Sequence, residues 1–277
     1  MGWIRGSKKH EPALMRLILR DEALCVPVSA RFRDDSKGCT LYVNGSEDGA
    51  RVQECLLHTS HGLVLPILPE GGRDCEELRS KLLDLRPPVH SIMGVGSWVR
   101  RIQSLMPLSP SASVEYNLMT ITADEVQPPA TQFFSPVIRR ASPSDAEALF
   151  PLQKSYEKEE VVINPHIFNE LQCMRLLKKS LQEELIFFAS KDGLPVSKAG
   201  TNARGFGFDQ IGGVFTAVPE RGKGYAEAVM RVLLTFIFEE KHGACLFVKK
   251  KNRPANSLYE KLGFKTVGDY VICYYGI

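Results

Sequence analysis

The sequence predicts an α/β protein made of two α/β halves. Its 277 residues suggest about two domains, at roughly 150 residues per domain. Each half contains a strand-like run that ends in a Ser-x-Asp-Gly turn, at Gly49 and at Gly193. Asp-Gly favours a tight β-hairpin, and a further strand, a helix and another strand follow in the same order in both halves. A degenerate duplication would explain this order, and chance similarity between two common hairpins is the alternative.

The pattern of apolar residues defines the individual elements. The helix predicted over 225–241 has apolar side chains at i, i+3, i+4, i+7 and i+8 from Val229 onward, the spacing of one buried face. Ser142 and Pro143 are typical of a helix start, directly after a strand. In the first half we predict strands over 41–49, 62–68 and 89–93 and a helix over 75–85; in the second, strands over 137–141, 186–193, 210–218 and 244–249 and a helix over 225–241.

A linker is predicted between the halves. The stretch 125–132 has no periodic apolar pattern. The paired prolines Pro128 and Pro129 exclude a helix, and they lack the backbone N–H groups that a β-strand would donate to its neighbour. We therefore predict a first domain at 1–126, a linker at 127–135 and a second domain at 136–277.

The composition argues against a disordered protein, a collagen and a coiled-coil array. The 44% hydrophobic and 24% charged residues are ordinary globular values, and the net charge of +3 does not by itself indicate a nucleic acid or membrane partner. No apolar run approaches the roughly 18 residues of a membrane span, and the first residues are charged where a signal peptide would be apolar. Seven scattered cysteines without a C-x-x-C pair fit free thiols. These features predict a cytoplasmic protein.

No metal site is predicted. Cys55, His58 and His61 could be drawn as ligands, but no second pair accompanies them and the spacing does not fit structural zinc.

The segment from Gly213 to Ala226 carries the clearest chemical signal. It consists of an apolar strand, a turn containing Gly222 and Gly224, and the start of the amphipathic helix. The glycines allow a tight turn with N–H groups pointing outward, and the helix N-terminus adds positive partial charge. We predict a site for a phosphate or pyrophosphate.

Two familiar phosphate loops do not fit this turn. The lysine-serine or lysine-threonine ending of a P-loop is missing, and so is the third glycine of a dinucleotide fingerprint. The segment resembles instead the Arg-x-x-Gly-x-Ala pyrophosphate loop of the GNAT superfamily of N-acetyltransferases, on Arg221, Gly224 and Ala226. A surface arginine beside a structural turn is the alternative.

A second motif follows at the distance that this family requires. The run from Val248 to Phe264 is similar to the family's strand, Asn-x-x-Ala, helix, Tyr and Gly-Phe pattern. On this resemblance, Asn252 caps the helix and hydrogen-bonds the pantetheine arm, and Tyr259 brings a phenol near the thioester sulfur. The resemblance covers about 137–277 and implies a mixed, mostly antiparallel GNAT sheet flanked by helices.

The whole chain also resembles a bacterial two-domain subgroup in which a smaller, degenerate GNAT-like α/β half comes first. In this interpretation 90–94 and 116–120 belong to the degenerate half. Its own turn, Glu70 to Arg73, does not match the pyrophosphate loop, so we expect no acetyl-CoA there.

The resemblance implies acetyl-CoA as co-substrate, lying where two neighbouring strands splay apart. The acceptor amine attacks the thioester carbonyl, and the leaving thiolate takes a proton from an acid. Tyr259 is the candidate acid; a packing role is the alternative. The resemblance assigns the carbonyl to the backbone of Val214, Phe215 and Thr216, and the pyrophosphate to backbone N–H groups of Gly222, Lys223, Gly224, Tyr225 and Ala226, beside Arg221.

The base is not singled out. Gln210 occupies the strand position where some family members carry glutamate, and it cannot take a proton. Asp209 is adjacent but should point to the opposite face of the strand. Glu157, Glu159 and Glu160 could attract a cationic amine or relay its proton through water.

Three functions compete on these observations. The leading hypothesis is an acetyl-CoA-dependent N-acetyltransferase acting on a primary amine of a small molecule or peptide. The rival, suggested by Gln210, is an acyl-CoA-binding regulatory module without turnover. A nucleic-acid-binding protein using 249–251 is the third, and a solvated or phosphate-contacting loop explains that lysine run better. We expect no nucleic acid or membrane partner, and a homodimer stays open.

Overall fold

A computed structural model of the chain describes residues 2–34, 38–69, 75–129, 136–163 and 168–275. The turn at 70–73 and most of the predicted linker at 127–135 lie outside the described residues.

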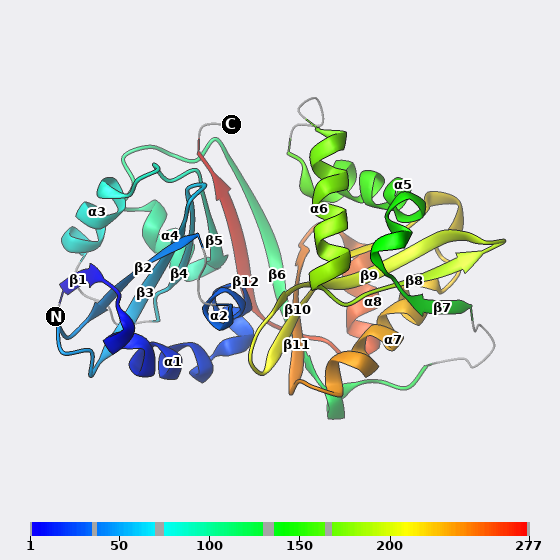
Figure 1. The fold of residues 1–277 in the computed structure, drawn as a ribbon, viewed down its shortest axis with the longest axis horizontal. Helices are drawn as coiled ribbons and strands as arrows, with labels where there is room; N and C mark the ends of the chain where they lie inside the picture. Colours follow the sequence, from blue (N-terminus) through cyan, green and yellow to red (C-terminus); the bar gives the residue numbers. More distant parts are fainter. Residues whose placement is uncertain (1, 35–37, 70–74, 130–135, 164–167, 276–277) are drawn as a thin grey trace.

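The strands form one continuous sheet across the molecule (Figure 1). Its order is β1-β2-β3-β4-β5-β12-β6-β11-β10-β9-β8-β7. Only the β4–β5 and β10–β11 pairs of the described strands are parallel, so the sheet is mixed and mostly antiparallel as predicted. The strands are β1 (Gly2–Arg5), β2 (Cys39–Gly45), β3 (Val52–Thr59), β4 (Leu63–Ile67), β5 (Ser91–Val95), β6 (Ala112–Thr122), β7 (Val137–Arg140), β8 (Ile186–Lys191), β9 (Leu194–Arg204), β10 (Phe208–Thr216), β11 (Gly243–Lys249) and β12 (Lys265–Tyr274).

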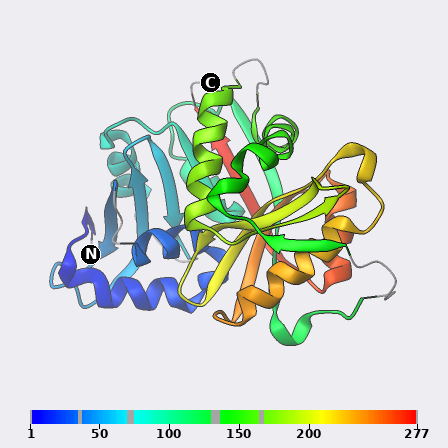
Figure 2. The same cartoon turned by 45° about the vertical axis from the view of Figure 1, so that its right-hand side comes forward.

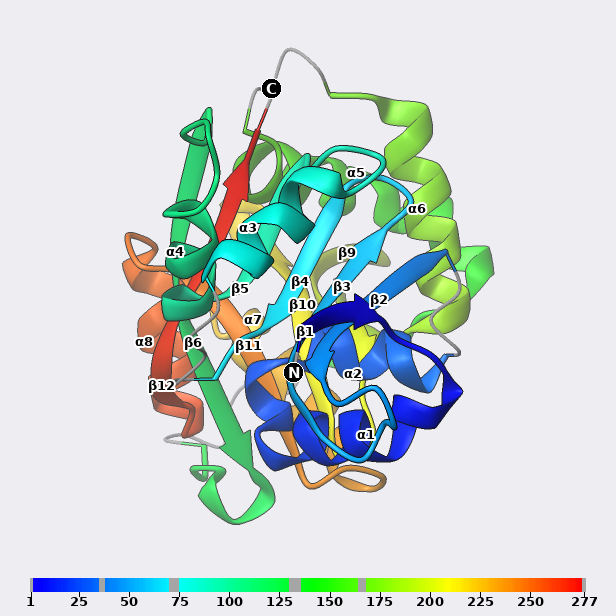
Figure 3. The same ribbon diagram turned by 90° about the vertical axis from the view of Figure 1, so that its left-hand side faces the viewer.

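The last strand of each half is inserted into the other half, an exchange that the sequence did not predict. β6 lies between β11 and β12, and β12 lies between β5 and β6 (Figures 1 and 3). The β6–β11 ladder runs from Thr122 opposite Gly243 to Tyr116 opposite Lys249. The segment 116–120, assigned to the first half from the sequence, is therefore hydrogen-bonded within the sheet of the second.

Helices cover both faces of the sheet (Figure 2). Neighbouring residues of a strand point to opposite faces, so Phe188 packs under α5 and α6 whereas Phe187 packs against α7. The helices are α1 (Glu11–Arg20), α2 (Val26–Arg33), α3 (Cys75–Asp84), α4 (Gly96–Gln103), α5 (Ala146–Tyr156), α6 (Glu170–Glu183), α7 (Tyr225–Phe238) and α8 (Arg253–Leu262).

Both predicted hairpins are present, with different turns. Asp192 and Gly193 have φ of 51° and 79°, which gives the tight turn expected between β8 and β9. Between β2 and β3 only Gly49 has a positive φ, because the Asp48 carboxylate accepts hydrogen bonds from Ser46 and from the Ala50 N–H and holds a longer turn.

Strand and helix ends differ slightly from the prediction. β10 ends at Thr216 rather than at 218, since Pro219 lies in a short helical turn, Val218–Glu220. β5 begins at Ser91 rather than at 89, and α7 ends at Phe238. All seven cysteines are free of disulfides. No helix among the described residues is long and apolar enough to cross a membrane.

Candidate active site

The second half has an opening between two neighbouring parallel strands. β10 and β11 pair only at Phe208, Asp209 and Gln210, opposite 243–245. Beyond Gln210 the two strands are no longer paired, while β11 stays paired with β6 on its other edge from Gly243 to Lys249. The splayed strands inferred from the sequence are therefore present, and β6 of the first half forms the far side of β11.

A β-bulge distorts β10 beside this opening. The register against β9 shifts between Gly212, which faces Gly200, and Phe215, which faces Lys198. Two residues on β10 therefore stand opposite one on β9. Gly213 takes a φ of +62°, a conformation that favours glycine.

The glycine turn connects β10 to α7. Gly222 and Gly224 have φ of 75° and 87°, and Gly224 is the N-cap of α7. A Cβ added at Gly222 would meet no atom within 4 Å, so this face of the turn is open. The turn therefore has the backbone conformation that the prediction of a phosphate site needs.

The side chains around the turn are charged and partly exposed. Arg221 lies over the Phe215 ring, 5.1 Å from its centroid, and donates to the Thr216 carbonyl. Lys223 pairs with Glu220 at 3.0 Å. The Tyr225 side chain is buried in the hydrophobic core beneath α7. The role predicted for Tyr225 in binding pyrophosphate therefore rests on its backbone N–H.

The second motif lies on the other side of the opening. The Asn252 side chain accepts from the Ala255 N–H at 3.2 Å and caps α8, as predicted. Tyr259, on α8, is only 7% exposed and packs edge-on against Phe264. Burial raises the pKa of Tyr259, so the phenol keeps its proton at neutral pH.

A single turn of π-helix after α5, Glu157–Val161, bridges the two motifs; we call it the acidic segment. Its Glu159 pairs with Arg221 at 2.8 Å. Its Glu160 pairs with Lys249 at 3.0 Å and accepts from the Asn252 amide at 3.2 Å. Two of the predicted substrate carboxylates therefore contact predicted cofactor residues in this structure.

The third carboxylate of the acidic segment is in a different environment. Glu157 accepts from Gln153 at 2.9 Å, and burial raises its pKa. Lys198 lies close enough to lower that pKa in part.

Asp209 and Gln210 are both buried in β10, before the opening. Asp209 accepts from Arg204 at 3.0 Å, in a group that includes Glu240 bonded to the same arginine. Asp209 thus belongs to an ion-pair network at the far end of β10, and the structure does not bring it to the acidic segment. Gln210 is 3% exposed and is the last residue of β10 that pairs with β11.

The charge of Glu160 acts on three buried or half-buried tyrosines, and sequence reasoning identified only one of them. Burial raises the pKa of Tyr116, Tyr156 and Tyr259, and the Glu160 charge raises each further. Tyr116 comes from the exchanged strand β6, so the first half contributes a side chain to this site. No sequence signal reveals it, because the strand exchange is a property of the whole sheet.

Lys198 is a further residue that the sequence reasoning missed, besides Tyr116 and Tyr156. It lies on β9, is 4% exposed, and donates from Nζ to the Gly213 carbonyl at 2.9 Å. A lone lysine in the apolar run 194–199 could have drawn attention to it.

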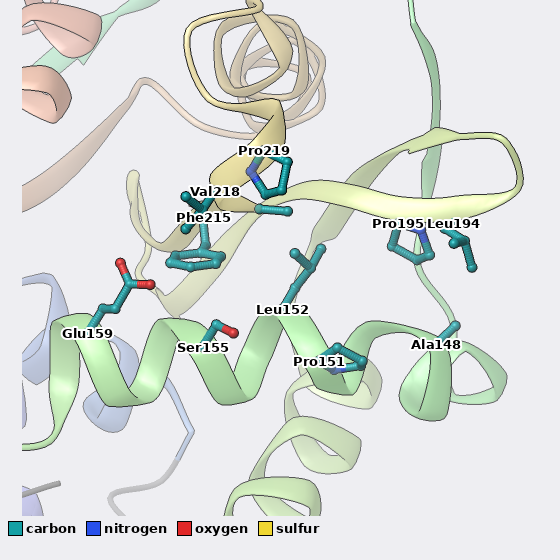
Figure 4. Close-up of a pocket in the computed structure, with 11 residues that line it drawn as sticks. Ala148, Pro151, Leu152, Ser155, Glu159, Leu194, Pro195, Phe215, Val218 and Pro219 are labelled. Atoms are coloured by element: carbon teal, nitrogen blue, oxygen red, sulfur yellow. The ribbon is translucent and has the colours of Figure 1, made fainter.

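An apolar pocket adjoins the opening on the face covered by α5 (Figure 4). It has a volume of about 400 Å³, and Figure 4 shows the Phe215 ring across from Ser155 while Glu159 lies at one end. Its other walls come from α5, from the start of β9 and from the turn after β10: Ala148, Pro151, Leu152, Ser155, Leu194, Pro195, Ala217, Val218 and Pro219.

The splayed strands, the open glycine turn and the capped helix lie together in one α/β unit of the second half. The model of the Acetyltransferase (GNAT) family matches residues 149–264, which include all three features. Residues 149–264 of the second half therefore form a GNAT domain.

Solved structures share the arrangement of the whole chain. A Drosophila protein is similar over 98% of both chains with a TM-score of 0.72 at 12% identity. A GCN5-related N-acetyltransferase from Kribbella flavida covers 92% of this chain and 96% of its own, with a TM-score of 0.62 at 14% identity. A tandem GNAT protein from the clavulanic acid biosynthesis pathway covers 99% and 98%, with a TM-score of 0.58 at 11% identity. At these identities the likeness is one of fold. None of the curated proteins matches the chain in sequence.

Proposed function

We propose that this protein is an acetyl-CoA-dependent N-acetyltransferase that moves an acetyl group to a primary amine of a small molecule or peptide. The observation that carries the proposal is the opening between β10 and β11, with the open glycine turn on one side and Asn252 on the other. The match of residues 149–264 to the family supports it.

In this proposal the turn holds the pyrophosphate. Backbone N–H groups from Gly222 to Ala226 and the N-terminus of α7 bind the phosphate oxygens, and Arg221 and Lys223 add positive charge. Asn252 hydrogen-bonds the pantetheine arm, and the backbone of 214–216 beside the bulge holds the thioester carbonyl. Arg221 must then leave Glu159, since one guanidinium fork cannot pair fully with two anions.

The chain's own residues then serve a direct transfer in a ternary complex. The amine nitrogen forms a bond to the thioester carbon, and the backbone of β10 stabilises the oxyanion. The C–S bond breaks as Tyr259 protonates the thiolate, a role that needs the phenol to be protonated at neutral pH. Glu160, which pairs with Lys249 and accepts from Asn252, is the candidate to take the proton that the amine loses.

Calorimetric titration with acetyl-CoA and with CoA tests the site. Wild type should bind both, and Arg221→Glu combined with Gly224→Asp should abolish binding, because two carboxylates then face the phosphates. Gly193→Asp is the matched control, since it puts the same side chain at a φ of +79° away from the turn. Wild type that binds neither ligand would overturn the proposal.

Release of the CoA thiol distinguishes an N-acetyltransferase from an acyl-CoA-binding regulatory module without turnover. Free CoA should appear steadily when acetyl-CoA is mixed with some member of a panel of primary amines. Binding without turnover across the panel would favour the regulatory module.

A further inference from the structure

Lys198 is a charged side chain inside the second half's core. Its neighbours across the sheet are Phe188 on β8 and Phe215 on β10, and its ammonium lies 5.1 Å from the Tyr156 ring centroid. Burial lowers the pKa of Lys198 to about 8, while Glu157 on the acidic segment and the Cys173 thiol on α6 act in the opposite direction. Burying an ammonium lowers the free energy of unfolding, so the charge of Lys198 destabilises the fold.

Lys198 and Tyr156 both lie against Gly213 in the bulge. The Lys198 ammonium donates to the Gly213 carbonyl at 2.9 Å. The Gly213 N–H lies close enough to the Tyr156 hydroxyl to lower the pKa of that phenol. Gly213 has a φ of +62° and stands where the register shifts. The Gly213 N–H belongs to the preceding peptide, so the Lys198 contact is the one made to the peptide between Gly213 and Val214.

That peptide joins the buried cation to the opening. The C=O of Gly213 and the N–H of Val214 belong to the same planar peptide group. A cation bonded to the oxygen polarises the group and makes its N–H a stronger donor. Val214 is one of the residues to which the thioester carbonyl is assigned above.

We propose that the Lys198 ammonium polarises the 213–214 peptide and so strengthens the Val214 N–H as the hydrogen-bond donor to the carbonyl oxygen of bound acetyl-CoA. This inference rests on the proposed function. Lys198 touches no reacting atom and is a positioning residue, whose charge reaches the oxyanion through one peptide bond.

The carbonyl stretch of bound [1-¹³C]acetyl-CoA reports this donor directly, without an acceptor amine. With the protein in excess, the stretch should lie at lower frequency in wild type than in Lys198→Met, which keeps the apolar stem and removes the charge. In wild type the stretch should rise between pH 7 and pH 9.5 as Lys198 loses its proton. Lys198→Met should show no such change, and Lys179→Met, on the exposed side of α6, should behave like wild type.

A second variant separates charge from geometry. Tyr156→Phe removes the hydroxyl near the Gly213 N–H but keeps the Lys198 ammonium, so its carbonyl stretch should retain the pH dependence. Loss of the pH dependence in Tyr156→Phe would show that the bulge geometry, and not the charge, sets the donor, and would overturn the inference.

The affinity for CoA, which has no acyl carbonyl, keeps the two proposals distinguishable. Lys198→Met should bind CoA within about twofold of wild type, and its kcat should fall about tenfold with KM for acetyl-CoA unchanged. If wild type and Lys198→Met bind CoA equally and show the same carbonyl frequency, this inference is overturned and the proposed function stands. Wild type that does not bind CoA would overturn both.

Discussion

The two halves contain the same parallel junction, and they use it differently. In the first half β4 and β5 pair at Leu63 and Val64, and in the second β10 and β11 pair up to Gln210. β4 runs against β3 in unbroken register, whereas β10 carries the bulge at Gly213 against β9.

The space beside each junction is filled in opposite ways. In the first half Gly94 of β5 lies against the Pro66 ring and the Val99 side chain of α4, so the junction is packed with apolar atoms. In the second half the junction leads to the ion pair of Lys249 with Glu160. One shared framework therefore becomes a polar site through local changes: a bulge, a glycine turn and a buried lysine.

The exchanged strands β6 and β12 should make each half depend on the other for its stability, and this is the largest effect that we expect. Residues 136–277 alone should show no cooperative unfolding, because β6 is the neighbour of both β11 and β12. Cutting the folded chain within 127–135 should instead leave the two fragments bound together. Gel filtration with and without urea, and thermal melts of the isolated fragment, measure this.

A native-like melt of the isolated fragment would contradict the prediction. It would mean that the second half forms its core without the first, and that the exchange adds little to its stability.

The buried lysine sharpens the comparison through pH. The first-half strand β3 buries the Glu54 carboxylate, which pairs with Arg101, whereas β9 buries the ammonium of Lys198. The pKa of Lys198 falls from 10.5 to about 8 on folding, so the charge costs stability fully below pH 8 and ceases to do so above pH 10.5. Wild type should therefore gain about 3 kcal/mol relative to Lys198→Met across that range.

Urea unfolding of both proteins at pH 7 and pH 10 measures this gain. The difference between the two proteins isolates Lys198 from the other groups that titrate. A constant difference would show that the lysine has the same pKa in both states.

The contact between the halves offers a smaller test. The buried Glu22 carboxylate accepts from the N–H groups of Phe206 at 2.6 Å and Gly207 at 2.8 Å, and from the Ser29 hydroxyl. It thus joins the first half to the turn between β9 and β10. Glu22→Gln replaces one acceptor oxygen with a donor, so it should lower the free energy of unfolding by about 2 kcal/mol.

Chemical denaturation gives this value. Glu11→Gln, at the exposed start of α1, is the control and should stay within about 0.5 kcal/mol of wild type. An equal effect of both variants would contradict a role for Glu22 in joining the halves.

The local parts of the site could be predicted from the sequence because they depend on neighbouring residues. The cap at Asn252 follows from an asparagine before a helix, and the turn at Gly222 and Gly224 from glycines between a strand and a helix. The hairpin at Asp192 follows in the same way.

The parts that could not be predicted depend on contacts distant in sequence. Tyr116 reaches the site only because β6 crosses into the second sheet, and nothing in its own segment encodes that partner. The Glu159–Arg221 pair joins residues 62 positions apart. Glu159, predicted to attract an amine, is for this reason found paired with Arg221, which we propose binds the cofactor.

That pair yields the smallest expected effect. Glu159 and Arg221 are 42% and 47% exposed, so their interaction is worth about 0.2–1 kcal/mol. Glu159→Gln frees Arg221 for the phosphates and should lower the Kd for CoA by up to about fivefold, less so at high salt. Calorimetry at low and high NaCl measures this, with Glu183→Gln, which breaks the exposed pair with Lys179, as control. If Glu159→Gln weakens CoA binding, the carboxylate supports the cofactor site instead of competing with it, and Glu159 then belongs to the binding surface that distinguishes the second half from the first.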